Sequence, residues 1–504
     1  MNRRNFLAAT SACTVPMLLN GFGLKAMTRQ SVLVNSLLQS GAACTDRVLV
    51  MVYLNGGNDG LNTVIPLDQL STYRSLRANI ALPDASLLRL GGTDKMAFHP
   101  GMGGMRNLFD DGRLTVIHSM AYPNPDQSHF RSTDIWMTAA DSNVSLTTGW
   151  AGRYLEDRYP GYPTGYPNAQ MEDPIALQIG YLTSTTLLGS QQSMGVAIND
   201  PDAFYQLVGA EQPISPGDVP AGEAGRMIAY IRQQQALAVG YAGEIKTAYD
   251  AGQTRSTYPA ENLKNELAEQ LKIVARLIHG GLKTKIFFVS LGGFDTHSGQ
   301  ILNDNPLTGL HAELLKKLSD GLYAFQEDLR LQGNQERVVG MTFSDFGRRA
   351  NSNASKGTDH GVAAPQFVFG AAVKHQVIGQ NPNLSDLTES WGGNKDIKMQ
   401  IDFRRMYADI LNDWFCSGQT KTNSLLLHNF PTLSLFSDVC ETIASGPWGS
   451  AGTWSVGRVP LPTERVRVNA GHVVTVNETV TVRSAQVQGT VRYVAPAARL
   501  RLVG

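Results

Sequence analysis

Residues 338–361 read VVGMTFSDFGRRANSNASKGTDHG and begin with a continuous apolar run, 338–343, that is typical of a buried strand. Asp345 follows where the strand gives way to a loop, and an Asp359-His360 pair closes the stretch. Proteins of the α/β class place their chemistry at the carboxyl ends of parallel strands, so these three residues are candidate ligands of one metal ion. The structural alternative is that Asp345 caps a helix and Asp359 makes a turn.

A second stretch, KIFFVSLGGFDTH over 285–297, repeats this pattern. A buried strand over 286–291 leads into a Gly-Gly turn, and Asp295 and His297 come next. Between the two strands, leucines at helical spacing over 306–332 predict a helix. Because a strand–helix–strand unit opens both strand ends on the same edge of a parallel sheet, the two Asp/His clusters are expected to face one crevice.

A third strand end adds another carboxylate. The run RVLVMVYL over 47–54 predicts the first strong strand, and it leads into Asn-Gly-Gly-Asn-Asp-Gly. Two glycines after a buried strand allow a close approach of backbone. Asp59 is therefore a candidate metal ligand, and the alternative is a simple Asp-Gly turn.

Ser128 and His129 follow a proline-rich loop and open a predicted helix. Ser128 is a candidate nucleophile and His129 a candidate phosphate or metal contact, although a serine in such a place is more often an N-cap. Arg348 lies between the acidic groups and is a candidate for neutralising an anionic ester. The commoner fate of such an arginine is a surface ion pair.

Carboxylates with neutral imidazoles suit a divalent metal, and the candidates are Zn²⁺, Mn²⁺, Mg²⁺ and Ca²⁺. Such a metal polarises an ester oxygen and lowers the pKa of a bound water or serine. The sequence has no Walker loop, no GxGxxG and no Gly-x-Ser-x-Gly elbow. This argues against nucleotide binding of those kinds and against α/β-hydrolase chemistry.

Composition and the amino-terminal segment bear on location and partners. Acidic and basic residues balance at 43 each in 504 residues, so no nucleic-acid partner is indicated. Residues 1–27 carry the order Arg-Arg-x-Phe-Leu and resemble a twin-arginine export signal, and 28–46 is a linker. The apolar run is too short for a membrane span. We expect an exported protein that is periplasmic, attached to the cell surface or secreted.

Three cysteines remain once the signal is removed: Cys44, Cys416 and Cys440. An oxidising compartment permits a Cys416–Cys440 disulfide and leaves Cys44 over. No Cys-x-x-Cys occurs, which argues against a zinc site built from thiolates.

The patterns divide the chain into two parts. Residues 47–440 predict an α/β domain with a mostly parallel sheet, in which 183–282 is a helical insertion over the sheet edge and a candidate lid. From 445 to 504, valines alternate with polar residues and turns recur, which predicts a small all-β module. Its last runs suit coils of a parallel β-helix.

Six blocks in order resemble the bacterial DUF1501 family: LNGGNDGLNTVIP, HFRSTDIWMT, TGWAGRYL, GGFDTH, SDFGRR and GTDHG. That family is similar to the alkaline phosphatase/sulfatase superfamily. The resemblance implies a parallel sheet sandwiched by helices, one or two divalent metals, and a nucleophile of the Ser/Thr type.

The resemblance also implies roles for individual residues. By position, the implied metal ligands are Asp59, Asp295, His297, Asp345, Asp359 and His360. Ser128 is the best match to the nucleophile, and Thr133 is a weaker one. Phe346 stands where the superfamily usually has the histidine of its second metal, which puts that second site in doubt.

The C-terminal module resembles bacterial surface β-helix domains around Trp448 and Trp454. This implies attachment to cell-surface polysaccharide. Together the patterns and the resemblance favour an exported metal-dependent hydrolase of phosphate or sulfate esters, with an anionic ester or glycan as substrate. The alternative is a non-catalytic exported binding or scaffold protein that keeps the fold and a structural metal. An unrelated metal-assisted reaction is the third hypothesis.

Overall fold

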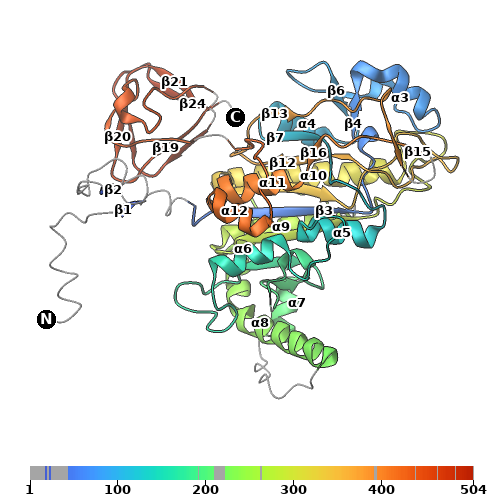
Figure 1. The fold of residues 1–504 in the computed structure, drawn as a ribbon. Helices are drawn as coiled ribbons and strands as arrows, with labels where there is room; N and C mark the ends of the chain where they lie inside the picture. The colour runs from blue at the N-terminus through green and yellow to red at the C-terminus, as the bar shows by residue number, and fades with distance from the viewer. Residues whose placement is uncertain are drawn as a thin grey trace.

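The computed structural model describes residues 18–19, 22–23, 44–190, 192–208, 222–260, 264–390, 394–436, 439–462, 464–482 and 484–502 (Figure 1). Apart from a strand pair, β1 (Leu18–Leu19) and β2 (Phe22–Gly23), the predicted export signal lies outside the described residues. In the part of the chain that is described, no helix combines the length and the apolar character needed to cross a membrane.

A nine-stranded sheet forms the core of the α/β domain, in the order β13-β7-β12-β11-β3-β10-β8-β9 with β16 beside β7. The central strand is parallel to both its neighbours, and of the other strands only β12 runs antiparallel to the strands on either side. Central strands are buried on both faces, which explains their continuous apolar sequence. The strands are β3 (Val48–Asn55), β7 (Leu114–Ala121), β8 (Ala176–Ile179), β9 (Val196–Ile198), β10 (Ile286–Gly292), β11 (Val338–Ser344), β12 (Ala364–Phe369), β13 (Gln376–Ile378) and β16 (Ile401–Asp402).

Helices lie above and below the central strand β3 in Figure 1. The helix α9 packs on β10, α5 packs on β11 and α4 packs on β7, while α10 lies against both α4 and α9. The predicted α/β class, a mostly parallel sheet sandwiched by helices, is confirmed. The helices are α3 (Leu70–Leu76), α4 (Gly103–Asp110), α5 (His129–Thr138), α6 (Trp150–Arg158), α7 (Pro201–Val208), α8 (Glu223–Ala251), α9 (Glu266–His279), α10 (Leu310–Gln332), α11 (Arg404–Asp409) with a π-helical turn (Ile410–Trp414), and α12 (Gln419–Leu426).

Residues 183–282, predicted as an inserted lid, contribute to several parts of the domain. The strand β9 is the edge strand of the main sheet, and α9 packs on β10 and α10. The helices α7 and α8 pack on each other, and α8 also contacts β9 and α9. Figure 1 shows α7 and α8 extending away from the sheet on its lower side. Two small antiparallel sheets complete the domain: β4 (Val64–Pro66), β5 (Leu88–Arg89) and β6 (Met96–Phe98), and β14 (Thr388–Ser390) with β15 (Asn394–Asp396).

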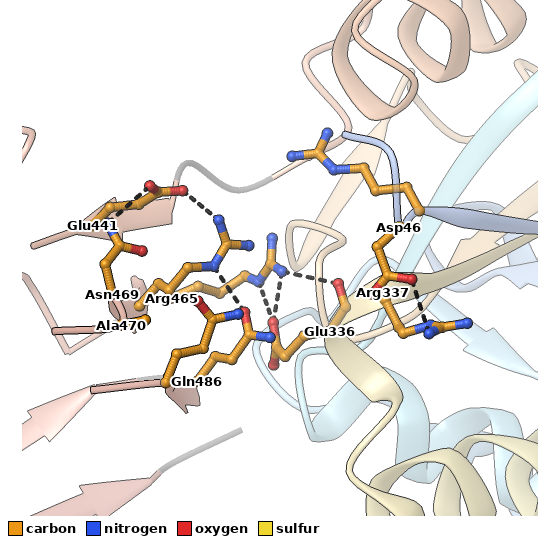
Figure 2. Close-up of a pocket in the computed structure, with 11 residues that line it drawn as sticks. Asp46, Glu336, Arg337, Glu441, Arg465, Asn469, Ala470 and Gln486 are labelled. Carbon is orange, nitrogen blue, oxygen red and sulfur yellow. Dashed lines mark hydrogen bonds and ion pairs between the residues drawn. The ribbon is translucent and has the colours of Figure 1, made fainter. Parts of the chain in front are cut away.

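The C-terminal residues form an all-β module, built from three small parallel sheets: β17-β19-β22, β18-β20-β23 and β21-β24. Its first strand, β17, precedes the predicted start at residue 445. Alternate valines point into a core of their own around Trp448 and Trp454. Figure 2 shows the face where the module meets the α/β domain. The strands are β17 (Val439–Glu441), β18 (Gly446–Pro447), β19 (Arg465–Val468), β20 (Val473–Val476), β21 (Thr479–Val482), β22 (Ser484–Val487), β23 (Thr490–Tyr493) and β24 (Arg499–Leu502).

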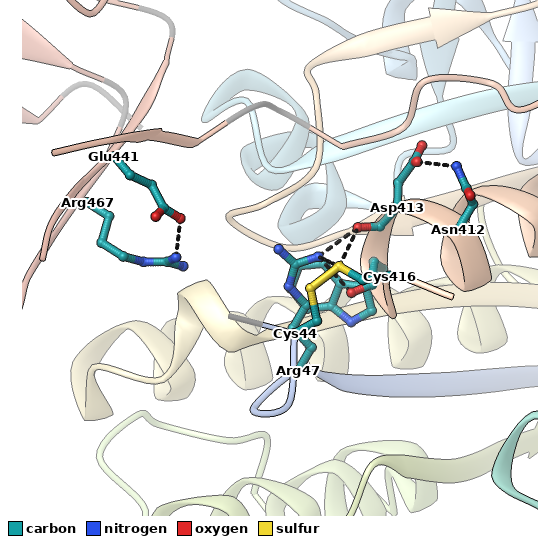
Figure 3. The surroundings of a disulfide bond; sticks show 8 residues. Cys44, Arg47, Asn412, Asp413, Cys416, Glu441 and Arg467 are labelled. Atoms are coloured by element: carbon teal, nitrogen blue, oxygen red, sulfur yellow. Dashed lines mark hydrogen bonds and ion pairs between the residues drawn. A yellow bond between two sulfur atoms is a disulfide. The ribbon is translucent and has the colours of Figure 1, made fainter. Parts of the chain in front are cut away.

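The disulfide differs from the prediction, because Cys416 pairs with Cys44 rather than with Cys440 (Figure 3). Trp414 Nε1 donates to the carbonyl of Val48 at 3.2 Å, which holds the end of the π-helical turn against the start of β3. This contact brings Cys416 to the segment just before β3, where Cys44 lies. Cys440 is buried in the module core and its Sγ donates to Glu464 at 3.2 Å. The predicted Cys416–Cys440 pairing is therefore wrong.

Candidate metal centre

The candidate centre lies where the parallel strands β3, β10 and β11 end. Their registers align Leu54 with Leu291 and Ser344, so the loops that follow begin at one edge of the sheet. Asp295 and His297 lie in the loop after β10. Two glycines after β3 allow the loops to approach each other closely. Gly56 has a φ of +119°, and a Cβ there would lie 2.4 Å from the Asp295 nitrogen.

Three imidazoles converge on one carboxylate oxygen, Asp295 Oδ1. The Nε2 atoms of His129, His297 and His360 lie 3.5, 3.2 and 3.4 Å from it. The Nε2 atoms of His297 and His360 are 2.9 Å apart. The Asp295 side chain is 47% exposed, so the cluster is accessible from solvent. Three ring nitrogens thus lie within 3.5 Å of Asp295 Oδ1 at the sheet edge.

The opposite nitrogen of each ring is held by an acceptor that lies outside the cluster. Nδ1 of His129 lies 2.6 Å from Asp345 Oδ2, and Nδ1 of His297 lies 3.1 Å from Asp359 Oδ1. Nδ1 of His360 lies 2.8 Å from the carbonyl oxygen of Gln127. A carbonyl oxygen can only accept, so His360 carries its hydrogen on Nδ1 and presents a lone pair at Nε2. The same tautomer suits the other two rings.

This arrangement fits a tetrahedral metal ion such as Zn²⁺. Ligand atoms about 2.0–2.1 Å from zinc at tetrahedral angles lie roughly 3.3–3.4 Å apart, close to the separations seen around Asp295. The Nε2 atom of His129 is buried and has no hydrogen-bond partner among the described residues. Metal-binding histidines generally donate their other N–H to a carboxylate or a carbonyl, as all three do in this protein. His129, Asp295 and His360 each place a ligand atom within 4.8 Å of the others.

The charges around the centre shift the pKa values of its groups in different directions. The hydrogen bond from His129 to Asp345 raises the pKa of that imidazole, and its partial burial opposes this only in part. Burial lowers the pKa of His360. Burial pushes the pKa of Asp295 upward, but the hydrogen bond and charge of Arg348 outweigh this, so the pKa is below its ordinary value. Asp295 is therefore an anion at neutral pH.

Arg348 has a positioning role in this geometry. It is completely buried and its guanidinium lies 2.5 Å from Asp295 Oδ1. Its other N–H groups donate to backbone carbonyls of Gly56, Gly57, Phe294 and Thr358. With its donors engaged in this way, Arg348 fixes Asp295 and joins the three loops. It does not offer a free pair of N–H groups to a substrate anion. The predicted neutralising role does not fit this burial.

Ser128 is the N-cap residue of α5, next to His129. Its side chain is exposed, and among the described residues its Oγ has no hydrogen-bond partner. The N-terminus of a helix favours a bound anion because its first N–H groups are unpaired and the helix dipole is positive there. A cavity of about 750 Å³ adjoins Ser128 and is lined by prolines 123 and 125, Tyr122, Met399, Lys398 and Glu389, among others. An anionic group at Ser128 would extend into this space.

Three predicted ligands occupy other positions. Asp59 is completely buried behind the centre, where it pairs with Arg77 and accepts from Gln300 Nε2 at 2.6 Å. The glycine turn after β3 carries the chain past the sheet edge before Asp59, which explains why its strand-end position was misleading. Asp345 accepts from Tyr53 and from the Gly56 N–H as well as facing His129. Asp345 and Asp359 thus orient imidazoles from outside the inner set.

Sequence reasoning missed two parts of the site. The carbonyl of Gln127 gives no residue-type signal, because any residue in that loop could supply it. Asn353 donates to both the carbonyl of His297 and the carboxylate of Asp359, which ties the two loops together. Asn353 lies in a run rich in Ser and Asn, and its residue type alone does not mark it as part of a site.

Phe346 and Thr133 also have defined places. Phe346 is buried, its ring lies 4.6 Å from that of His360 and 4.7 Å from that of His129, and a Cβ on Gly57 would meet it at 2.6 Å. This aromatic side chain fills the space beside the cluster. The Thr133 hydroxyl lies 2.9 Å from the Tyr53 hydroxyl, within the network that holds Asp345.

Comparisons with known proteins give distant similarities. No curated protein matches the chain. A solved structure of a protein in the alkaline phosphatase superfamily from Vibrio parahaemolyticus is 11% identical with a TM-score of 0.31, over 67% of this chain and 64% of that one, so this chain spans less than two thirds of its length. The PsFucS1 sulfatase from Pseudoalteromonas sp. is 12% identical with a TM-score of 0.31, over 69% and 67% of the two chains. At such TM-scores these similarities assign no activity.

The family comparison is more specific. The matching region, residues 216–423, contains β10 and β11 and the loops with Asp295, His297, Asp345 and His360. The predicted resemblance is thereby confirmed over this part of the chain, which matches the family described as "Protein of unknown function (DUF1501)".

Proposed function

We propose that this chain is a metal-dependent hydrolase of phosphate or sulfate esters that uses one divalent cation. The ligands are His129, Asp295, His297 and His360. The observation that carries the proposal is the common orientation of three imidazoles, which give their Nδ1 hydrogens to outer acceptors and turn their Nε2 atoms to one carboxylate oxygen. Such an arrangement turns several candidate ligand atoms towards one point, which suits a divalent cation.

The cation supplies Lewis-acid polarisation of the ester and its attacking oxygen. The chain supplies the remaining parts. The N-terminus of α5 attracts the anionic ester group, and the Ser128 hydroxyl lies beside it as an attacking oxygen. The adjoining cavity accommodates the alcohol that leaves. Net hydrolysis consumes one water and yields this alcohol with free phosphate or sulfate. Arg348 keeps Asp295 ionised and in place throughout.

Export and a glycan substrate are part of the same proposal. The Arg-Arg-x-Phe-Leu order near the start of the chain supports export, and the Cys44–Cys416 disulfide suits an oxidising compartment. The cavity beside Ser128 combines apolar walls with Lys398 and Glu389, which suits a sugar as leaving group. The C-terminal module would serve retention on cell-surface polysaccharide.

A scaffold protein with a structural metal is the second candidate. One observation favours it: among the described residues, no base accepts a hydrogen bond from the Ser128 hydroxyl. In that case the metal would hold the loops after β3, β10 and β11 together without turnover. Both candidates require the same ligands, so metal binding alone does not separate them.

A measurement of substrate turnover distinguishes the hydrolase from the scaffold protein. The full chain would be stripped of metal with a chelator and then reloaded with Zn²⁺, Mn²⁺, Mg²⁺ or Ca²⁺ in turn. Each form would be assayed on aryl phosphates, aryl sulfates and sulfated oligosaccharides, beside the Asp295→Asn variant and the His428→Ala control. His428 is exposed and lies outside the centre, at Asp141. Hydrolysis that needs metal, is lost in Asp295→Asn and is kept in His428→Ala is expected. Full metal loading without turnover on any substrate would favour the scaffold.

A further inference from the structure

A second polar cavity lies at the opposite end of the central strand, where the α/β domain meets the C-terminal module (Figure 2). It measures about 380 Å³. The domain contributes Asp46, Arg47, Glu336 and Arg337, which precede β3 and β11. The module contributes Glu441, Arg465, Arg467, Asn469, Gln486 and Gln488. Four arginines therefore face three carboxylates, which leaves an excess of positive charge.

The cavity is a defined junction between the two parts of the chain. Arg465, only 4% exposed, reaches across from β19 and donates from Nε and Nη2 to Glu336 Oε2 at 2.8 and 2.6 Å. On the domain side, Arg47 donates to the carbonyls of Asp413 and Trp414, beside the Cys44–Cys416 disulfide (Figure 3). A buried ion pair and a disulfide thus fix the two walls of the cavity.

Several guanidinium N–H groups in this cavity lack an acceptor among the described residues. Arg467 uses Nε for Gln486 and Nη1 for Glu441, and its Nη2 is left over. Arg465 leaves Nη1 unused, and Arg47 leaves Nε and Nη2 unused. Burial, and then the charges of Arg465 and Arg467, lower the pKa of Arg47 to about 10. Several guanidinium groups this close together, with N–H groups that have no acceptor among the described residues, favour the binding of an anion.

We propose that this cavity binds a sugar unit that bears a sulfate, phosphate or carboxylate group. The spare donors of Arg47, Arg465 and Arg467 recognise the oxyanion, because planar guanidinium groups match such oxygens. The amides of Gln486 and Gln488 offer both donors and acceptors for sugar hydroxyls. The cavity volume lies within the range of small-molecule sites, and so exceeds the need of a bare inorganic ion.

This binding site is separate from the metal centre. The strand β3 has eight residues, so the two sites lie roughly 25 Å apart along it. The inference goes beyond ester hydrolysis and does not depend on it, since a protein without turnover would bind the same ligand here. For a hydrolase of anionic glycans, the cavity would hold one part of a chain while another part reaches the centre.

Calorimetry on the full metal-loaded chain tests the proposal with three probes: galactose 6-sulfate, neutral galactose and inorganic sulfate. We expect galactose 6-sulfate to bind, with an affinity that falls as ionic strength rises, and galactose not to bind. Arg467→Gln should weaken binding about tenfold or more, since it removes a charged donor. Arg492→Gln, an exposed arginine on β23 of the same module, should leave binding unchanged.

A second variant, with the opposite expected effect on affinity, controls for misfolding of Arg467→Gln. Glu441→Gln removes the carboxylate that competes for Arg467, so it should tighten binding of galactose 6-sulfate. Equal affinity in the wild type, Arg467→Gln and Glu441→Gln would overturn the proposal, as would the absence of galactose 6-sulfate binding. Equally tight binding of inorganic sulfate and galactose 6-sulfate would overturn its sugar part.

Discussion

The two ends of β3 carry opposite chemistry. At the carboxyl end, the Nε2 atoms of three imidazoles surround one oxygen of Asp295. At the amino end, guanidinium groups line a cavity, and some of their N–H groups have no acceptor in the part of the chain that the structure describes. In our two proposals, the first end takes a cation and the second an anion. The role of a polar group at the edge of an α/β sheet thus depends less on its position than on its neighbours. These neighbours decide whether ligand atoms or N–H donors are available at that edge.

The ends also differ in how they are built. The carboxyl end collects loops of one domain, and its second layer of Asp345, Asp359 and Gln127 fixes each ring. The amino end joins Arg47 to Arg465 and Arg467 from the other end of the chain. A buried ion pair, Asp59 with Arg77, lies behind the carboxyl end and belongs to neither proposed site. A series of substitutions can separate these three roles.

The largest effect on stability is expected for Arg77, whose charge belongs to neither of the two proposed binding sites. Arg77→Met leaves Asp59 buried and unpaired, so the free energy of unfolding should fall by about 3–5 kcal/mol. Metal stoichiometry of the folded variant should stay the same, since Asp59 lies behind the centre. Urea unfolding and metal analysis measure the two quantities.

Arg89→Met is the matched control for this ion pair. Arg89 pairs with Asp84 at the surface, with both side chains about half exposed, so its loss should cost less than about 1 kcal/mol. If Arg77→Met kept its stability but lost its metal, Asp59 would be a ligand and the division into binding and structural charges would be wrong.

Removing an inner imidazole should come next. His360→Ala takes away one of four ligands and should weaken zinc binding by at least about 100-fold, beyond the usual effect of a second-layer change. Competition with a chromophoric chelator measures this affinity, and His428→Ala should behave as the wild type. Galactose 6-sulfate binding at the amino end should be unchanged in both. Loss of binding at both ends would mean that the two ends are not independent.

Substitution in the second layer should have an intermediate effect. Asp359→Asn keeps the size of the side chain but weakens the acceptor for His297, so zinc affinity should fall about 10–100-fold. The same measurement serves, with Asp304→Asn as an exposed loop control. An effect as large as that of His360→Ala would instead identify Asp359 as a ligand.

The sequence predicted much of this architecture and less of the chemistry. Apolar runs located β3, β10 and β11 within a residue or two, and leucine spacing located α10, because burial on both faces leaves a strong local pattern. The antiparallel direction of β12 was not predicted, since strand direction depends on distant partners. Asp295, His297 and His360 were predicted as ligands and His129 as a phosphate or metal contact, and the structure brings these four side chains together.

The remaining features depend on contacts that local patterns do not encode. The separation of Asp295 from Asp345 and Asp359 into inner and outer layers rests on side-chain direction. The Cys44–Cys416 pairing follows from the packing of Trp414 on β3. The arginine cavity exists only because the C-terminal module packs beside Arg47. No periodic pattern in the sequence predicts that packing.

The smallest expected effect concerns pH. The folded-state pKa of His129 is raised above its ordinary 6.5, so in metal-free protein this group adds stability that is present below about pH 6.5 and lost as the pH rises through the folded value. With metal bound, His129 must be neutral, and stability should instead increase with pH. The difference in melting temperature between the wild type and His129→Gln would be measured from pH 5.5 to 8.5, with and without zinc. This difference should fall with rising pH in the metal-free protein and increase with rising pH in the zinc-loaded protein. Equal slopes would remove His129 from the ligand set.

We propose that the carboxyl end of β3 holds one metal ion. Crystals of the zinc-loaded chain, measured at the zinc absorption edge, test it directly. We expect one strong anomalous peak within about 2.0–2.2 Å of the Nε2 atoms of His129, His297 and His360 and of an oxygen of Asp295. A peak at Asp59, or no peak at this edge of the sheet, would contradict it.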